Sequence, residues 1–179
     1  PYDKYRNGDS SALSSSAKQG MMLFFSDKLK CVSCHQPPLF TNAAITKNID
    51  SIYFNTGLYN IHDSGSYPAN DPGLRKITGK LSDDGRFKVP TLRNISLTAP
   101  YTHDGGVNSM EEMIDIYKRG GRKIDYDPYR GDGSLNPNKS DKITGFHLSN
   151  DEKRQLIDFL TALTDSSVLV NPAFQNPVK

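Results

Sequence analysis

The segment from Cys31 to His35 constrains this chain most, because it places two cysteines and a histidine in the pattern Cys-x-x-Cys-His. This pattern is the attachment signature of a c-type haem. Each thiol adds across one vinyl group of the porphyrin, and the short turn between them holds the next residue against the iron. We therefore predict one covalently bound haem c, tethered by Cys31 and Cys34, with His35 as the proximal iron ligand.

Two other uses of a cysteine pair fit the sequence less well. A thioredoxin-like redox pair requires a βαβ context, which the hydrophobic pattern does not show. A structural zinc site requires about four cysteine or histidine ligands, whereas the chain has 2 cysteines in all. The remaining histidines, His62, His103 and His147, stand singly in the sequence. A structural metal-binding module is therefore the weakest of the interpretations.

The composition indicates a single domain with few regular elements. The length of 179 residues leaves little room for two domains. A hydrophobic fraction of 35%, with 14 Gly and 11 Pro, is low for a tightly packed globule. We expect long loops, and we expect the haem itself to form part of the core.

Neither nucleic acid nor a membrane is an expected partner. The formal net charge is only +2, which does not favour binding to polyanions. No apolar run approaches the ~20 residues that span a bilayer. Haem is attached to Cys-x-x-Cys-His outside the bacterial cytoplasm, so we expect a periplasmic protein whose targeting segment precedes Pro1.

Three segments have apolar residues at helical spacing, and each begins with serine. The first starts at residues 14–16 and runs to Phe24. Gly20 inside it favours close packing against another helix. The second runs from Ser109 to Gly120 and the third starts at Ser149, and both have a glutamate three residues after the serine, which predicts a capping box.

Turn residues dominate most of the remaining chain. Residues 36–97 are expected to be irregular and to wrap the haem, with short extended pieces at 52–54 and 86–89. Residues 122–142 form a charged, Gly- and Asn-rich segment that we expect to be a surface loop. The order of helices and haem motif predicts a mainly α, class I cytochrome c-like domain with long irregular loops around one covalent haem.

This fold class suggests a division of the chain into three parts. Residues 1–13 are expected to be a linker or docking arm, because they are polar and aromatic without periodicity. The cytochrome c-like haem domain is expected to span residues 14–165. Residues 166–179, which contain two prolines, are expected to form a C-terminal surface tail.

The second axial ligand of the iron decides the chemistry. Methionine raises the reduction potential and suits electron transfer, whereas an open position allows peroxide or O₂ to bind. A tyrosinate oxygen favours ferric and higher oxidation states. Met110, Met113 and Tyr117 share one helical face, and their spacing alone leaves all three as candidates.

Long stretches of the chain resemble the bacterial di-haem cytochrome c peroxidase and MauG family. Resemblance is strongest from Phe87 to Ile95 and from Leu97 to Gly106, which includes His103-Asp104-Gly105. It extends to residues 8–14, 54–58 and 148–160. The match covers nearly the whole chain but only the C-terminal half of such a protein.

The resemblance implies roles for particular residues. Aligning the His-Asp-Gly motif without gaps puts the second iron ligand at Tyr117, as in the MauG-like branch, with Met113 as the fallback. His103 and Arg93 match residues near the haem, where a propionate contact is plausible chemistry.

A calcium ion between domains is also implied, bound by backbone carbonyls at Thr98 and Pro100, since oxygen ligands suit Ca²⁺. The third protein ligand of that ion comes from the other domain in the family. The calcium site is therefore expected to be incomplete within this chain.

These features predict the six-coordinate, electron-relaying or charge-storing haem of a peroxidase-type oxidoreductase. Hydrogen peroxide would react at a second haem c on an N-terminal domain, so no catalytic residue is assigned here. The expected partners are that N-terminal domain and an electron-donor or substrate protein. The alternative hypothesis is a stand-alone one-haem cytochrome c that carries electrons without catalysis.

Overall fold

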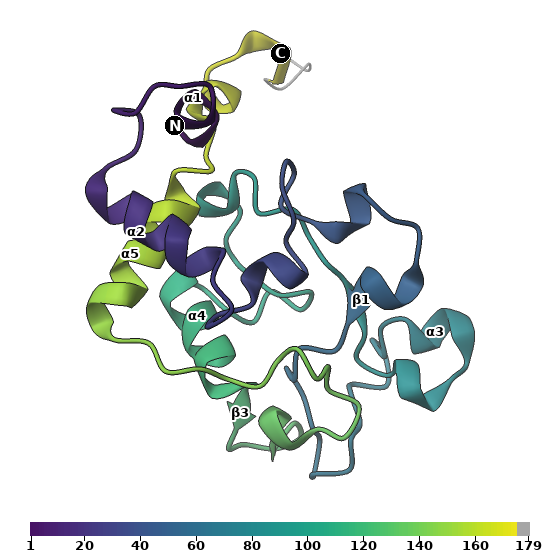
Figure 1. The fold of residues 1–179 in the computed structure, drawn as a ribbon. Helices are drawn as coiled ribbons and strands as arrows, with labels where there is room; N and C mark the ends of the chain where they lie inside the picture. The colour runs from purple at the N-terminus through teal and green to yellow at the C-terminus, as the bar shows by residue number, and fades with distance from the viewer. Residues whose placement is uncertain (175–179) are drawn as a thin grey trace.

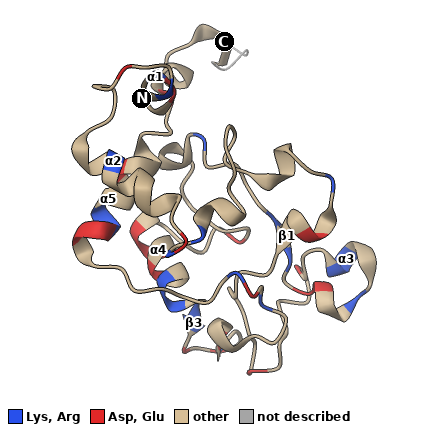
Figure 2. Cartoon of the chain, viewed as in Figure 1, with Lys and Arg blue, Asp and Glu red and all other residues tan. Residues whose placement is uncertain are grey.

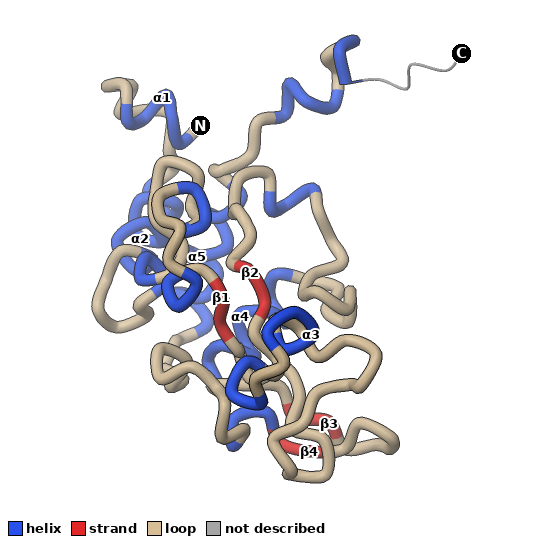
Figure 3. The backbone as a smooth tube through the Cα atoms, turned by 90° about the vertical axis from the view of Figure 1, so that its right-hand side faces the viewer, coloured by secondary structure: helices blue, strands red, loops and turns tan. Residues whose placement is uncertain are grey.

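A computed structural model describes residues 1–174 of the chain, and its regular elements are mainly helical. Two pairs of very short strands form separate antiparallel ribbons (Figure 3). The α-helices are α1 (Tyr2–Arg6), α2 (Ser15–Phe24), α3 (Arg75–Thr78), α4 (Met110–Arg119) and α5 (Asn150–Thr161). The strands are β1 (Tyr53–Phe54), β2 (Phe87–Lys88), β3 (Lys123–Ile124) and β4 (Gly131–Asp132). The 3₁₀ turns are Cys31–Ser33, Asn42–Ala44, Ile49–Ser51, Leu81–Asp83, Ile95–Leu97, Gly133–Leu135, Ser166–Leu169 and Pro172–Phe174.

The helical part of the predicted fold class is therefore confirmed. The two expected extended pieces also form, because β1 pairs with β2 through Tyr53–Lys88 and Phe54–Phe87. Wrapping of these loops around a haem stays a prediction.

Helices α2 and α5 cross at close range on one side of the molecule (Figure 1). Ser14 caps α2 by accepting a hydrogen bond from the Ala17 amide at 3.0 Å. At the crossing, a Cβ atom added to Gly20 would lie 1.8 Å from the backbone oxygen of Gln155. The prediction that Gly20 packs against another helix is thus confirmed, because only a residue without a side chain allows this approach.

The predicted serine caps of α4 and α5 are both present. Ser149 and Glu152 form a complete capping box at α5. At α4, Ser109 accepts from the Glu112 amide at 3.1 Å, but the Glu112 carboxylate accepts from the Asn108 amide instead of closing the box. Acidic residues in the first turn of α4 and basic residues in its last turn complement the helix dipole (Figure 2).

Helix α4 lies between two apolar clusters. Its Ile114 belongs to a cluster with Phe24, Phe40 and residues of α5. Its Ile116 belongs to a second cluster that contains Tyr59 and other residues of the long loops. One helix therefore joins the helical side of the molecule to the irregular side, and it ends at Gly120 with a φ of +84°, as the sequence predicted.

The first thirteen residues are docked on the body of the molecule. Tyr2 is only 5% exposed and meets Phe40 and Phe159 edge-on, at ring distances of 5.2 and 5.9 Å. Its amide donates to the Ala162 carbonyl at 3.1 Å. The segment expected to be a linker or docking arm is thus held by the core, and the proposed division into three parts stays a prediction.

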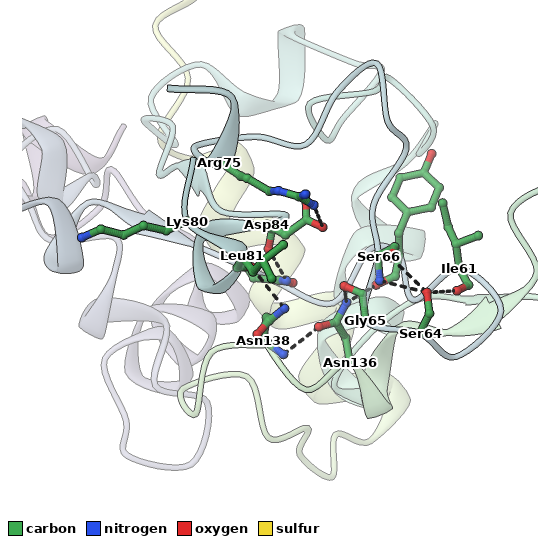
Figure 4. Close-up of polar contacts among 12 residues, drawn as sticks. Ile61, Ser64, Gly65, Ser66, Arg75, Lys80, Leu81, Asp84, Asn136 and Asn138 are labelled. Carbon is green, nitrogen blue, oxygen red and sulfur yellow. Dashed lines mark hydrogen bonds and ion pairs between the residues drawn. The ribbon is translucent and has the colours of Figure 1, made fainter. Parts of the chain in front are cut away.

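The expectation of a surface loop at residues 122–142 is wrong in part. Strands β3 and β4 form a hairpin inside this segment, and Ile124 and Asn136 are buried. Asn136 donates to the Tyr59 carbonyl at 2.8 Å and to the Gly65 carbonyl at 3.1 Å. Asn136 and Gly65 are labelled in Figure 4. The charged composition of this segment did not indicate that the Asn136 side chain is buried and joins loops that are distant in the sequence.

The C-terminal segment is exposed as far as it is described. Leu169, Val170 and Phe174 are each at least 63% exposed, and the surface tail at residues 166–179 stays a prediction. Residues 175–179 of the predicted tail lie outside the described part of the chain. Within residues 1–174, no helix is long and apolar enough to cross a bilayer.

Gly20→Ala should lower the free energy of unfolding by about 3 kcal/mol, because its methyl group would overlap backbone that cannot move without separating α2 from α5. Gln19→Ala, an exposed change on the same helix, should alter it by less than about 0.5 kcal/mol. Chemical denaturation of the haem-loaded protein measures both. Equal effects of the two substitutions would contradict the close crossing.

Candidate cofactor site

A cavity of ≈ 450 Å³ lies between the helices and the long loops. Its wall is mainly apolar, with contributions from α2, α4, α5 and β2 and a larger number of residues from the irregular segments between them. The side chains predicted to tether the haem or to bind its iron, those of Cys31, Cys34, His35, Met110, Met113 and Tyr117, all belong to this wall, together with His103 and Tyr101. The structure therefore brings every predicted haem-tethering and iron-ligating residue to one space.

The His35 imidazole is oriented by the backbone. Its Nδ1 atom lies 3.0 Å from the Phe40 carbonyl oxygen. Because a carbonyl only accepts, Nδ1 carries the proton, and Nε2 keeps the lone pair that can bind a metal. Burial lowers the pKa of His35, which favours the neutral, ligating form of the ring.

Phe40 adopts an unusual conformation to make this contact. Its φ is +54° and its side chain is fully buried, although bulky residues rarely occupy the left-handed region. The next residues anchor the same loop, because Thr41 donates to the Val89 carbonyl at 2.7 Å and Asn42 donates to the Ser33 carbonyl at 2.9 Å. The turn that carries His35 is thus fixed from its C-terminal side.

Both cysteines are free thiols in the cavity wall. Burial raises the pKa of Cys31 to about 12 and also raises the pKa of Cys34. A reactive redox pair needs a lowered thiol pKa, so the surroundings do not favour a thioredoxin-like function. These surroundings suit thiols that form stable thioether bonds to a haem.

Tyr117 differs from the other tyrosines near the cavity. Its hydroxyl makes no hydrogen bond to any described residue, whereas Tyr59, Tyr67 and Tyr101 each donate one. Burial raises the pKa of Tyr117 above its usual value. Tyr117 is only partly buried and belongs to the cavity lining, so its hydroxyl, which no described residue engages, is open to a metal ion bound in the cavity. Met110 and Met113 line the same wall, and the choice among the three stays a prediction.

The two residues expected near haem propionates are separated. His103 lines the cavity and stacks on Phe87 at a ring distance of 3.5 Å. Arg93 lies outside the cavity lining. Its guanidinium binds the Asp3 carboxylate at 2.7 and 2.9 Å, and its Nε donates to the Pro38 carbonyl at 2.8 Å. Arg93 therefore fastens α1 to the loop that follows His35.

Lysines at the cavity were missed by sequence reasoning. Lys30, Lys88 and Lys142 belong to its lining, whereas none of the lining residues is acidic. They stand on irregular segments or short strands, so no periodicity marks them. Together they give the cavity a positive edge.

The expected calcium ligands also lie at the edge of the cavity. Thr98 and Pro100 belong to its lining and are exposed. Within residues 1–174 there is no group of three or more His, Cys, Asp or Glu side chains that could hold a metal ion. A calcium ion bound by backbone carbonyls stays a prediction.

The cavity suits a haem in its chemistry. A porphyrin is a flat, mostly apolar ring with two vinyl groups and two anionic propionates. The cavity offers an apolar wall, two adjacent protonated thiols, an imidazole with a free nitrogen, an unpaired phenol and a lysine edge.

Comparison with known proteins agrees with this assignment, although no family model matches the chain. It is 36% identical over 188 residues to cytochrome-c peroxidase IdrP1 from Pseudomonas sp. (strain SCT), covering 96% of this chain and 46% of that protein. It is 33% identical over 165 residues to the methylamine utilization protein MauG from Methylorubrum extorquens, covering 91% of this chain and 38% of that protein. The chain thus spans about half the length, or less, of these curated relatives.

Solved structures show the same fold. A MauG-like protein associated with microbial copper homeostasis superposes with a TM-score of 0.92 and 42% identity, covering 99% of this chain and 51% of that one. The diheme peroxidase BthA from Burkholderia thailandensis gives a TM-score of 0.58 at 21% identity, over 86% of this chain and 43% of that one. The second match supports the fold alone.

Tyr117→Phe should open the sixth position of the haem iron and shift the ferric spectrum toward high spin, because phenylalanine has no ligating atom. Tyr101→Phe, which removes a hydroxyl at the same cavity that already donates to the Ile95 carbonyl, is the matched control and should leave the spectrum low spin. Absorption and electron paramagnetic resonance (EPR) spectra measure the change. An unchanged Tyr117→Phe spectrum together with an altered Met113→Ala spectrum would show that Met113 is the ligand.

Proposed function

The chain belongs to the di-haem cytochrome c peroxidase and MauG family, and on this premise we propose that it is the C-terminal, six-coordinate haem half of a peroxidase-type oxidoreductase. The observation that carries the proposal is the single cavity shared by Cys31, Cys34, His35 and Tyr117. Bound haem supplies a one-electron redox centre at this place.

The residues of the chain have distinct tasks in this proposal. Cys31 and Cys34 would tether the porphyrin, and His35, oriented by the Phe40 carbonyl, and Tyr117 would ligate its iron. Lys30, Lys88 and Lys142, which belong to the cavity lining, would compensate the propionate charge, and the propionate contacts of His103 and Arg93 stay predictions.

With both axial positions filled by protein, no position is left for peroxide to bind this iron. Reaction with hydrogen peroxide is therefore assigned to a second haem c on an N-terminal domain, for which the extra length of the relatives leaves room. This chain then stores or relays oxidising equivalents between that haem and a donor or substrate protein. A hard, anionic tyrosinate ligand stabilises the oxidised state of the iron and suits this task.

We further propose a calcium ion near the haem cavity and a periplasmic location for the protein. Thr98 and Pro100 stand at the cavity edge, where a calcium ion completed by the partner domain would stabilise the junction. Because haem is attached to Cys-x-x-Cys-His outside the cytoplasm, the protein is assigned to the periplasm.

Haem attachment should be visible in the intact mass, which should exceed the mass of the polypeptide by one haem for this half of the protein. The haem should resist extraction by acidified organic solvent, because thioether bonds survive it. Cys31→Ala with Cys34→Ala should release the haem to the solvent, whereas Ser33→Ala between them should retain it. Extractable haem in the unmodified protein would exclude covalent attachment.

Peroxide turnover should require the rest of the protein. The full-length protein should oxidise a reduced cytochrome or dye with hydrogen peroxide, while residues 1–179 alone should bind haem and show almost no turnover. Steady-state assays at equal haem concentration make the comparison. Comparable turnover by both would contradict the proposal, and absence of turnover in both would favour the stand-alone electron carrier.

A further inference from the structure

Five aromatic rings form a continuous cluster beside the cavity. His103 lies 6.4 Å from Tyr59 and 6.3 Å from Tyr67 between ring centres, in addition to its stack on Phe87. Tyr59 lies 5.4 Å from Tyr67 and 5.6 Å from Tyr129. These are edge and offset contacts between neighbouring aromatic rings, so the gaps between the rings are short.

The cluster connects the cavity to the molecular surface. Phe87 and His103 belong to the cavity wall. Tyr59 and Tyr67 are 8% and 4% exposed, whereas Tyr129 is 37% exposed. A path from the cavity through His103 and Tyr59 to Tyr129 therefore ends in solvent after three residues.

The hydroxyl groups of the two buried tyrosines have different partners. Tyr67 donates to the Asn55 amide oxygen at 2.7 Å, whereas Tyr59 donates to a carboxylate oxygen of Asp104 at 2.5 Å. An amide oxygen is a weak base, but a carboxylate can accept a proton. Tyr59 is the one of the pair that can lose its proton to a neighbour.

The Asp104 side chain is kept in its ionised, carboxylate form by its neighbours. Partial burial opposes its ionisation, but hydrogen bonds from Thr102, Tyr59, Arg122 and the Gly106 amide outweigh this effect and hold its pKa well below the usual range. Its side chain is 19% exposed, so the site reaches solvent. Burial, followed by the bond to Asp104, raises the pKa of Tyr59 to about 12, and the phenol keeps its proton at neutral pH.

The Arg122 side chain makes it unfavourable for Tyr59 to lose an electron while it keeps its hydroxyl proton. Its guanidinium lies 4.5 Å above the Tyr59 ring centre and also binds Asp104 at 2.8 Å. A positive charge this close destabilises a tyrosine radical cation. A neutral radical, formed when the proton moves to Asp104, does not incur that repulsion, so electron and proton leave together.

We propose that Tyr59 is a redox-active relay residue between the cavity and the surface at Tyr129. The inference rests on the proposed function, because the oxidant is an oxidised haem in the cavity. Tyr59 gives one electron to that haem through His103 and its hydroxyl proton to Asp104, which leaves a neutral tyrosyl radical and a carboxylic acid.

The resting state is restored in two balanced steps. Tyr129 gives one electron to the Tyr59 radical and its own proton to water, while Asp104 returns the proton to Tyr59. A one-electron donor at the surface then reduces the Tyr129 radical, which regains a proton from water. The net result is transfer of one electron from the donor to the haem.

The test uses the full-length, haem-loaded protein. It is mixed with hydrogen peroxide, and the reaction is frozen at short times and examined by EPR. Protein that contains ring-deuterated tyrosine identifies which signals come from tyrosyl radicals. Tyr59→Phe, which keeps the ring and removes the hydroxyl, should abolish the tyrosyl signal while the haem still becomes oxidised. Asp104→Asn should weaken it. Tyr126→Phe, an exposed tyrosine outside the cluster, is the matched control and should retain it.

Tyr129→Phe separates the relay from a simple radical trap. The Tyr59 signal should still form, but its decay on addition of ferrocyanide, a small anionic one-electron donor, should slow. A tyrosyl signal that persists in Tyr59→Phe while the haem is oxidised would overturn the proposal, as would ferrocyanide decay that Tyr129→Phe leaves unchanged.

A failure of the proposed function is recognised separately, because the haem spectrum would then not respond to peroxide at all. In that case a ruthenium polypyridyl photo-oxidant with persulfate supplies the oxidising equivalent in the Tyr126→Phe background. A tyrosyl signal that disappears on adding Tyr59→Phe supports Tyr59 as the redox-active residue, and one that remains excludes it.

Discussion

The crossing of α2 and α5 at Gly20 determines how the haem motif is placed. The backbones of the two helices approach so closely that even one methyl group would overlap them. Phe24 from α2 and Leu156 and Leu160 from α5 then form part of the cavity wall. Because α2 leads directly to the turn with both cysteines, the crossing fixes where that turn meets the cavity. The bond from His35 to the Phe40 carbonyl completes the arrangement from the other side.

Most of the chain outside these helices is irregular, and buried side-chain amides replace the hydrogen bonds that regular elements would provide. Buried backbone groups need partners. Asn55 donates to the Asp84 carbonyl, Asn60 to the Asp132 carbonyl, and Asn136 to two further carbonyls. Each bond joins segments at least 29 residues apart in the sequence. Loops held in this way can form a wall around a cofactor without a sheet or helix behind them.

Local signals in the sequence predicted local structure, but most contacts between residues that are distant in the sequence could not be predicted from it. The serine caps and Gly120 were found because their physics acts within a few residues of the chain, and Gly20 was found because a glycine inside a helical pattern indicates close packing, although its partner Gln155 lies far away in the sequence. Arg93 was matched to a place beside the haem, but its partner Asp3 stands 90 residues away, and no pattern announces such a pair. The lysines of the cavity edge and the aromatic cluster around Tyr59 come from separate loops, so neither has a period that sequence reasoning could detect. The motif itself was visible because haem attachment needs adjacent residues.

Two tyrosines of this chain stand in different surroundings, Tyr117 in the cavity lining and Tyr59 in the aromatic cluster beside it. Tyr117 and Tyr59 are both poorly accessible phenols whose pKa burial raises. Tyr117 has no hydrogen-bond partner among the described residues, so its oxygen is free for a metal ion that enters the cavity. Tyr59 donates its hydroxyl proton to the Asp104 carboxylate and lies under the Arg122 guanidinium, so its oxygen already has a partner. The different roles that we propose for these two phenols therefore follow from the groups around each of them and not from the residue type.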